Sequence, residues 1–219
     1  MAIEGKRGEA YRSAVEQAQL AFASRPMRDA ALAAGAQFDP VQEAAVLPLF
    51  GTAFRVSDQG RVIVRAVDGA SAHPAERILI LHYLAAAAGD PPAGRQMSFR
   101  EFPGARFYDS TFRAHTVQEL AGTFANDEGA FEAACRAAGG KREQGSGVRM
   151  EFLALPKVRV TLCYWAGEDD MPAGAQVLFD ASATSFLPVE DIAVVGESLV
   201  HRVVNAARGD GAVSLYEYD

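Results

Sequence analysis

The spacing of apolar residues along the chain predicts a set of amphipathic helices. Apolar side chains recur every three or four positions, which is the period of one helix face. The segments with this pattern are residues 8–23, 26–34, 74–88, 109–124, 127–138 and 188–207. Pro26 and Pro74 stand in first turns, where a missing N–H costs no helical hydrogen bond. The segment 74–88 is apolar on more than one face, so we expect this helix to be buried.

Shorter runs of apolar and β-branched residues predict strands between these helices. The runs cover residues 44–47, 52–56, 61–67, 96–100, 148–155, 158–165, 177–179 and 212–218. The turn at 57–60 ends in Gly60, which indicates an antiparallel hairpin. Glycines bracket residues 139–147, so a loop is expected there, around Lys141.

The mixed order of helices and strands, without β-α-β alternation, predicts an α+β fold. We expect antiparallel sheets packed with several helices in a single domain. Within it, residues 1–39 are predicted to form an N-terminal helical segment and residues 40–219 the main α+β domain. Both parts are expected to belong to one folding unit.

Composition and charge exclude several classes of function. The 219 residues carry a formal net charge of −7, and a negative surface repels nucleic acid. The longest apolar run, interrupted by His82, is far shorter than the roughly 20 residues that cross a bilayer. Cys135 and Cys163 are too far apart for a zinc or iron–sulfur motif. Residues 1–7 lack the apolar stretch of a signal peptide, so we expect a cytoplasmic protein.

Four stretches resemble, in their order and spacing, a known protein family. They are Ile80–Leu84, Ser98–Gly104 with Phe107-Tyr108, Leu178–Ala183 and Phe186–Ile192. Together they look like the bacterial and archaeal family catalogued as domain of unknown function 3786, over about residues 40 to 205. Some members of that family look like fusions to cysteine-rich iron–sulfur segments typical of anaerobes, and this chain lacks those cysteines. The resemblance implies that the protein is associated with anaerobic redox or corrinoid-related metabolism.

Aromatic and arginine side chains are interleaved between residues 99 and 113. This pattern is typical of an apolar pocket with a charged rim, where arginine forks bind the acid groups of a flat ligand such as a tetrapyrrole. The same pattern also describes core aromatics with arginines that extend to solvent. His82 adds an imidazole within an apolar helix, either as a metal or haem ligand or as a hydrogen-bonded core residue. The candidate ligand-binding residues are His82, Phe99, Arg100, Arg106, Tyr108 and Arg113.

These observations predict a binding or accessory domain that holds a corrinoid, a haem or another acidic small ligand, and they favour binding over catalysis. Two alternatives stay open. The apolar last helix and an edge strand at 212–218 would suit a protein-interaction domain or a homodimer. The carboxylates between Glu168 and Asp180, or His82, would suit an acid–base enzyme of unknown reaction.

No residue is assigned as catalytic or metal-binding. The acidic run Glu168–Asp170 is typical of a solvated loop. Asp180 and Ser182 are interpreted as a turn in which both side chains bond to nearby backbone amides. Cys135 and Cys163, in a helix and an apolar strand, are expected to pack as small hydrophobic residues.

Overall fold

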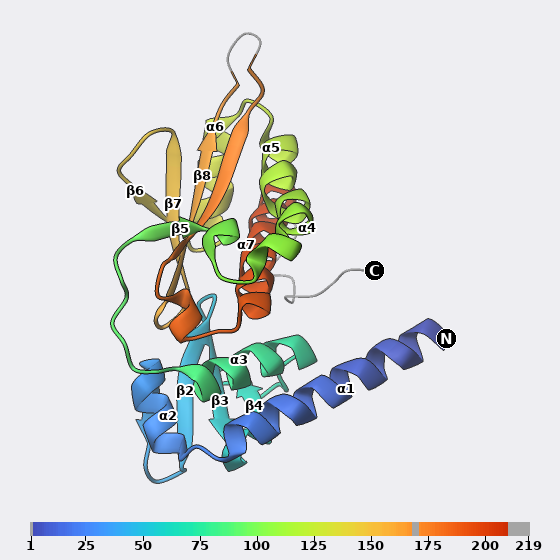
Figure 1. The fold of residues 1–219 in the computed structure, drawn as a ribbon, viewed down its shortest axis with the longest axis vertical. Helices are drawn as coiled ribbons and strands as arrows, with labels where there is room; N and C mark the ends of the chain where they lie inside the picture. The colour runs from blue at the N-terminus through green and yellow to red at the C-terminus, as the bar shows by residue number, and fades with distance from the viewer. Residues whose placement is uncertain (1, 168–170, 210–219) are drawn as a thin grey trace. The chain divides into compact units, whose positions relative to one another are not determined.

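The computed structural model describes residues 2–167 and 171–209, and its contacts divide the chain into two compact units (Figure 1). Unit 1 comprises Met1–Pro91, Leu155–Lys157 and Ser185–Leu187. Unit 2 comprises Pro92–Ala154, Val158–Thr184 and Pro188–Asp219. The boundary predicted after residue 39 lies within unit 1, and the expectation of one folding unit stays a prediction.

Unit 1 combines three helices with a four-stranded antiparallel meander (Figure 1). Its helices are α1 (Ala2–Ala23), α2 (Met27–Ala34) and α3 (Pro74–Ala86). Its strands are β1 (Gln37–Asp39), β2 (Ala44–Leu49), β3 (Thr52–Ser57) and β4 (Val62–Arg65). The predicted hairpin is confirmed, because β3 and β4 pair antiparallel across the turn that ends at Gly60.

The buried hydroxyl of Tyr83 ties separate parts of unit 1 together. Its oxygen lies 2.6 Å from the Ala34 carbonyl oxygen, to which it donates, and 3.1 Å from the Lys157 backbone nitrogen, from which it accepts. Burial raises the pKa of Tyr83 well above its usual range. The predicted burial of the helix 74–88 is confirmed, because Tyr83 and its neighbours Leu81 and Leu84 are fully enclosed.

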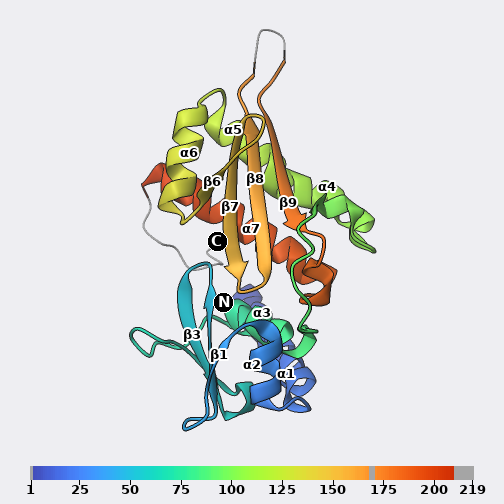
Figure 2. The ribbon, with the colours of Figure 1, turned by 90° about the vertical axis from the view of Figure 1, so that its left-hand side faces the viewer.

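Unit 2 is a five-stranded sheet with helices behind it, as Figure 2 shows. The strands follow the order β5-β9-β8-β7-β6. They are β5 (Gln96–Ser98), β6 (Lys141–Glu143), β7 (Val148–Leu155), β8 (Val158–Trp165) and β9 (Gly174–Asp180). The helices are α4 (Asp109–Arg113), α5 (Glu119–Phe124), α6 (Glu128–Ala137) and α7 (Val189–Arg208). The prediction of a loop around Lys141 is wrong for residues 141–143, because these residues form β6 and pair with β7.

The single helix predicted over 109–124 is instead two α-helical pieces joined by a π-helical segment, Ala114–Gln118. Thr116, which is fully buried there, donates its hydroxyl to the Phe112 carbonyl oxygen at 2.6 Å. A hydroxyl that bonds the carbonyl four residues earlier competes with the helical N–H for the same acceptor. The hydrogen bond of Thr116 therefore coincides with the wider π-helical turn. The spacing of apolar residues does not predict this turn.

Antiparallel sheets packed with helices confirm the α+β class expected from the sequence. No helix within residues 2–167 and 171–209 is long and apolar enough to span a membrane. Two predicted features, the acidic run Glu168–Asp170 and the strand 212–218, lie outside the described residues.

Helix α7 packs closely against the rest of unit 2 at Gly196. A β-carbon built on this residue would lie 2.7 Å from Phe112 Cε2 and 2.9 Å from Phe179 Cζ. Real β-carbons essentially never come that close to other heavy atoms. The missing side chain therefore lets α7 seat directly on two buried rings, one from α4 and one from β9.

We expect Gly196→Ala to lower the free energy of unfolding of unit 2 by about 1–3 kcal/mol, the usual cost of overpacking a core. The exposed Gly122 of α5 is the matched control, since nothing lies within 4 Å of a β-carbon there. Gly122→Ala should raise stability by roughly 0.5–1 kcal/mol through helix propensity. The single tryptophan, Trp165, lies in unit 2, so its fluorescence in urea follows this unit. Equal effects of the two substitutions would contradict the close approach.

Candidate functional site

A one-turn helix opens the segment that the sequence singled out. Ser98 and Glu101 cap this 3₁₀ turn, Phe99–Glu101. The Ser98 backbone nitrogen and hydroxyl oxygen donate to Glu101 Oε2 at 2.7 and 2.8 Å. These hydrogen bonds lower the pKa of Glu101, and the bond from the Ser98 side chain has the largest effect. The capping fixes the direction in which the chain leaves the sheet at β5.

The chain then reverses at Pro103-Gly104. Gly104 has a φ of +84°, and a β-carbon on it would meet Val189 Cγ1 of α7 at 3.7 Å. A second 3₁₀ turn, Ala105–Phe107, follows directly and leads into α4. The segment 99–108 is thereby held alongside the first turns of α7.

Burial separates the aromatic residues of this segment into two groups. Phe99 is buried and stacks on Phe112 with ring centroids 4.3 Å apart, and Phe102 packs edge-on against Phe179. For these rings the interpretation as core packing is correct. Phe107, in contrast, is 98% exposed. Such a ring contributes nothing to the core and is available to a binding partner.

A hollow of about 420 Å³ lies between this segment and α7, and we call it the groove. Volumes of this size are typical of small-molecule sites. Its lining residues are Phe99, Gly104, Ala105, Phe107, Tyr108, Val189, Glu190, Ala193 and Val194. The lining is mostly apolar and aromatic, and Glu190, which is exposed, is its only acidic side chain among the described residues.

Next to the groove, two polar side chains, those of Tyr108 and His115, meet at Glu197 of α7. The Tyr108 hydroxyl donates to Glu197 Oε1 at 3.0 Å, and His115 Nδ1 lies 3.4 Å from the same oxygen. The Glu197 side chain is 16% exposed. Burial raises the pKa of Glu197, although the Tyr108 hydrogen bond and His115 counteract part of this effect. Tyr108, which lines the groove, is thus oriented by a half-buried carboxyl group.

The structure gathers some of the candidate residues predicted from the sequence and not others. Phe99 and Tyr108 line the groove. Arg100, Arg106 and Arg113 belong to the same stretch of unit 2, but their side chains are exposed and do not line it. His82 lies half-buried in α3, which belongs to unit 1. Its predicted part in ligand binding stays a prediction.

Asp180 forms the turn that the sequence predicts, but the Ser182 hydroxyl donates to the Asp180 carboxylate and not to a backbone group. Asp180 accepts hydrogen bonds from the backbone nitrogens of Ala93, Gly94 and Ser182, at 2.8, 2.8 and 2.9 Å. Although burial opposes this effect, these bonds and the one from the Ser182 hydroxyl hold the pKa of Asp180 below its ordinary value. A carboxylate with this many donors is a structural anchor for the 91–95 loop.

The two cysteines are buried, and burial raises the pKa of both thiols. This agrees with their interpretation as packed residues. Cys163 faces the side of the sheet opposite the helices, where Arg149 Nη1 lies 3.2 Å from its Sγ. Arg149 also bonds to Gln96, and Gln96 Nε2 lies 2.9 Å from Thr161 Oγ1. This network joins strands that are distant in sequence, so sequence reasoning missed it.

Comparison with known proteins assigns the chain to a family. The sequence profile of the family described as Domain of unknown function (DUF3786) matches residues 27–202. The chain belongs to this family. The predicted resemblance is thereby confirmed, and the match extends further towards the N-terminus than expected. Searches of the curated proteins and of the solved structures find no match. Among the described residues, no group of three or more His, Cys, Asp or Glu is arranged to hold a metal ion.

Sequence reasoning missed Glu197 and the part of α7 that lines the groove. A weak signal exists, since Glu197 interrupts a helix whose neighbouring positions Val195, Ser198 and Leu199 are all buried. An acidic residue at the border of an apolar helix face is often only solvated. Its partners, Tyr108 and His115, come from a distant segment, which periodicity cannot identify.

The pKa values of Glu101 and Glu197 should be shifted in opposite directions from their ordinary value of 4.5, downwards for Glu101 and upwards for Glu197. As the pH falls, Glu197 should take up its proton first and Glu101 last, because burial favours the neutral form and donated hydrogen bonds favour the anion. Side-chain carbon NMR shifts followed against pH measure both midpoints. Because folding favours the protonated form of Glu197, its contribution to stability should fall as the pH rises through its midpoint. A midpoint for Glu197 at or below that of Glu101 would contradict this order.

Proposed function

We propose that this chain is a binding domain that holds a flat, largely apolar small ligand with at least one acidic group in the groove. The observation that carries the proposal is the almost fully exposed ring of Phe107 at the edge of an apolar hollow of about 420 Å³. An aromatic ring costs free energy when it is left in water, and a flat ligand would bury it.

The affinity for an acidic group is argued from Arg106. This residue stands between Ala105 and Phe107, two residues that line the groove, and its side chain is exposed. A guanidinium group at the rim binds a carboxylate through charge-assisted hydrogen bonds. Glu190 on the opposite wall repels a second acidic group, so the acidic end of the ligand is expected to lie at the Arg106 side.

A haem or a corrinoid is the tetrapyrrole form of this ligand class. Both combine a flat macrocycle with polar or acidic substituents, and the expectation of them comes from the arginine and aromatic pattern of residues 99–113. An imidazole would supply an axial ligand to the metal of either cofactor, and His82, considered for this part from the sequence, belongs to unit 1. The proposal for the groove does not depend on His82, which is tested separately.

The two alternatives have less support. The apolar positions of α7 that suggested a homodimer, Ile192, Val195, Leu199 and Val203, are buried within unit 2. The carboxylate Asp180, considered for acid–base chemistry, is held by donors in a turn. The acidic run 168–170 and the strand 212–218 lie outside the described residues, and His82, the other acid–base candidate, belongs to unit 1.

Four probes test the proposal on the full-length chain: haem, hydroxocobalamin, naphthoate and its neutral analogue naphthamide. We expect naphthoate to bind saturably and more tightly than naphthamide, as followed by NMR shifts of residues 99–108 and 189–194. Phe107→Ala should weaken naphthoate binding about two- to tenfold, the value of one aromatic contact. Arg106→Gln should remove the preference for the acid.

The control variants are Val67→Ala and Arg55→Gln, both at exposed positions of unit 1. Neither should change the affinity for naphthoate. Absorption spectra test the tetrapyrroles, and His82→Ala then shows whether that imidazole contributes. If neither tetrapyrrole binds, the ligand is a smaller acid. If naphthoate does not bind either, or binds the Phe107→Ala variant equally well, the proposal is wrong.

A further inference from the structure

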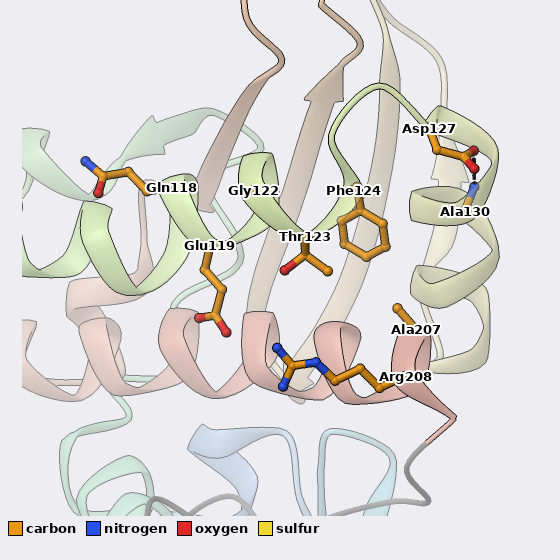
Figure 3. Close-up of a pocket in the computed structure, with 9 residues that line it drawn as sticks. All are labelled: Gln118, Glu119, Gly122, Thr123, Phe124, Asp127, Ala130, Ala207 and Arg208. Carbon is orange, nitrogen blue, oxygen red and sulfur yellow. Dashed lines mark hydrogen bonds between the residues drawn. The ribbon is translucent and has the colours of Figure 1, made fainter.

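We infer that unit 2 has a second binding site, which takes a small zwitterion with an apolar side chain, such as an α-amino acid or a dipeptide. The site is a hollow of about 720 Å³ between α5, the start of α6 and the end of α7. Its walls include Glu119, Phe124 and Arg208 (Figure 3). About 13 residues of α7, or roughly 20 Å of helix, separate it from the groove.

Two opposite charges extend into this hollow from different helices. Figure 3 shows the carboxylate of Glu119 and the guanidinium of Arg208 directed into the space between α5 and α7. Neither group forms an ion pair with the other, or with any other residue in the described part of the chain. A ligand that carries both an ammonium and a carboxylate group can satisfy the two at once.

The remaining acidic side chain of the hollow is already engaged. Asp127 caps α6, with its Oδ1 accepting from the Ala130 backbone nitrogen at 2.8 Å. Glu119 is therefore the carboxylate that an ammonium group would meet. Thr123, whose hydroxyl faces the same space in Figure 3, adds a neutral donor and acceptor.

Beside the two charges the hollow offers apolar surface. The ring of Phe124 forms one side, and Ala130 and Ala207 also line the hollow. An apolar side chain placed here would be removed from water. An α-amino acid carries both charges on one carbon and its side chain to one side, so two opposite charges with apolar surface beside them select such a ligand over a simple anion or a simple cation.

Calorimetry with phenylalanine and two blocked derivatives tests this inference on the full-length chain. N-acetylphenylalanine lacks the ammonium group, and phenylalaninamide lacks the carboxylate. We expect phenylalanine to bind and each derivative to bind at least tenfold more weakly. Glu119→Gln should abolish the penalty for acetylation, and Arg208→Gln should abolish the penalty for amidation. Phenylalanylphenylalanine is titrated in parallel, to distinguish an amino-acid ligand from a dipeptide.

The charge-swapped double variant, Glu119→Arg with Arg208→Glu, is the matched control. It should bind phenylalanine within about tenfold of the natural chain, because the ligand can bind in the reverse orientation. NMR shifts must map to residues 118–130 and 207–208, which separates this site from the groove. Equal affinity for phenylalanine and its blocked derivatives, or no binding of phenylalanine or the dipeptide, would overturn the inference without affecting the groove.

Discussion

The contact of the Gly196 backbone with the rings of Phe112 and Phe179 is the constraint on which unit 2 depends. Any side chain at this position would meet Phe112 at 2.7 Å, so α7 can lie this close to the sheet only as a glycine-containing helix. Close-packed interiors do not absorb such an overlap without moving a whole element. Both proposed binding sites use α7 as a wall, the groove at its beginning and the hollow at its end.

The aromatic residues between 99 and 112 have two roles, since some stabilise the core and one is available to a ligand. Phe99 and Phe112 stack in the core and anchor the segment. The capped turn at Ser98 and the reversal at Gly104 then direct Phe107 outwards. A rigid support with an exposed ring is a preorganised arrangement, because little conformational entropy remains to be lost when a ligand covers the ring.

Ionisable residues in this chain take their properties from burial and hydrogen bonding rather than from their type. Asp180 is buried, yet backbone donors keep it ionised. Glu197 is less completely enclosed, but it has fewer donors, and its pKa rises. The thiols of Cys135 and Cys163 have a raised pKa for the same reason, loss of water without sufficient compensation. A list of acidic residues and cysteines in the sequence does not distinguish these cases.

The sequence by itself determined the α+β class, the family, most helices and strands, the hairpin at Gly60 and the turn at Asp180. Most of these features depend on residues close together in the sequence, so the spacing of apolar residues and the turn and capping residues predict them. Only the tertiary structure decided which ring of the 99–112 segment is exposed, that Glu197 meets Tyr108 and His115, and that Glu119 and Arg208 face one hollow. Those contacts join residues up to 89 positions apart, and they depend on how whole helices pack. The spacing along the chain does not encode them.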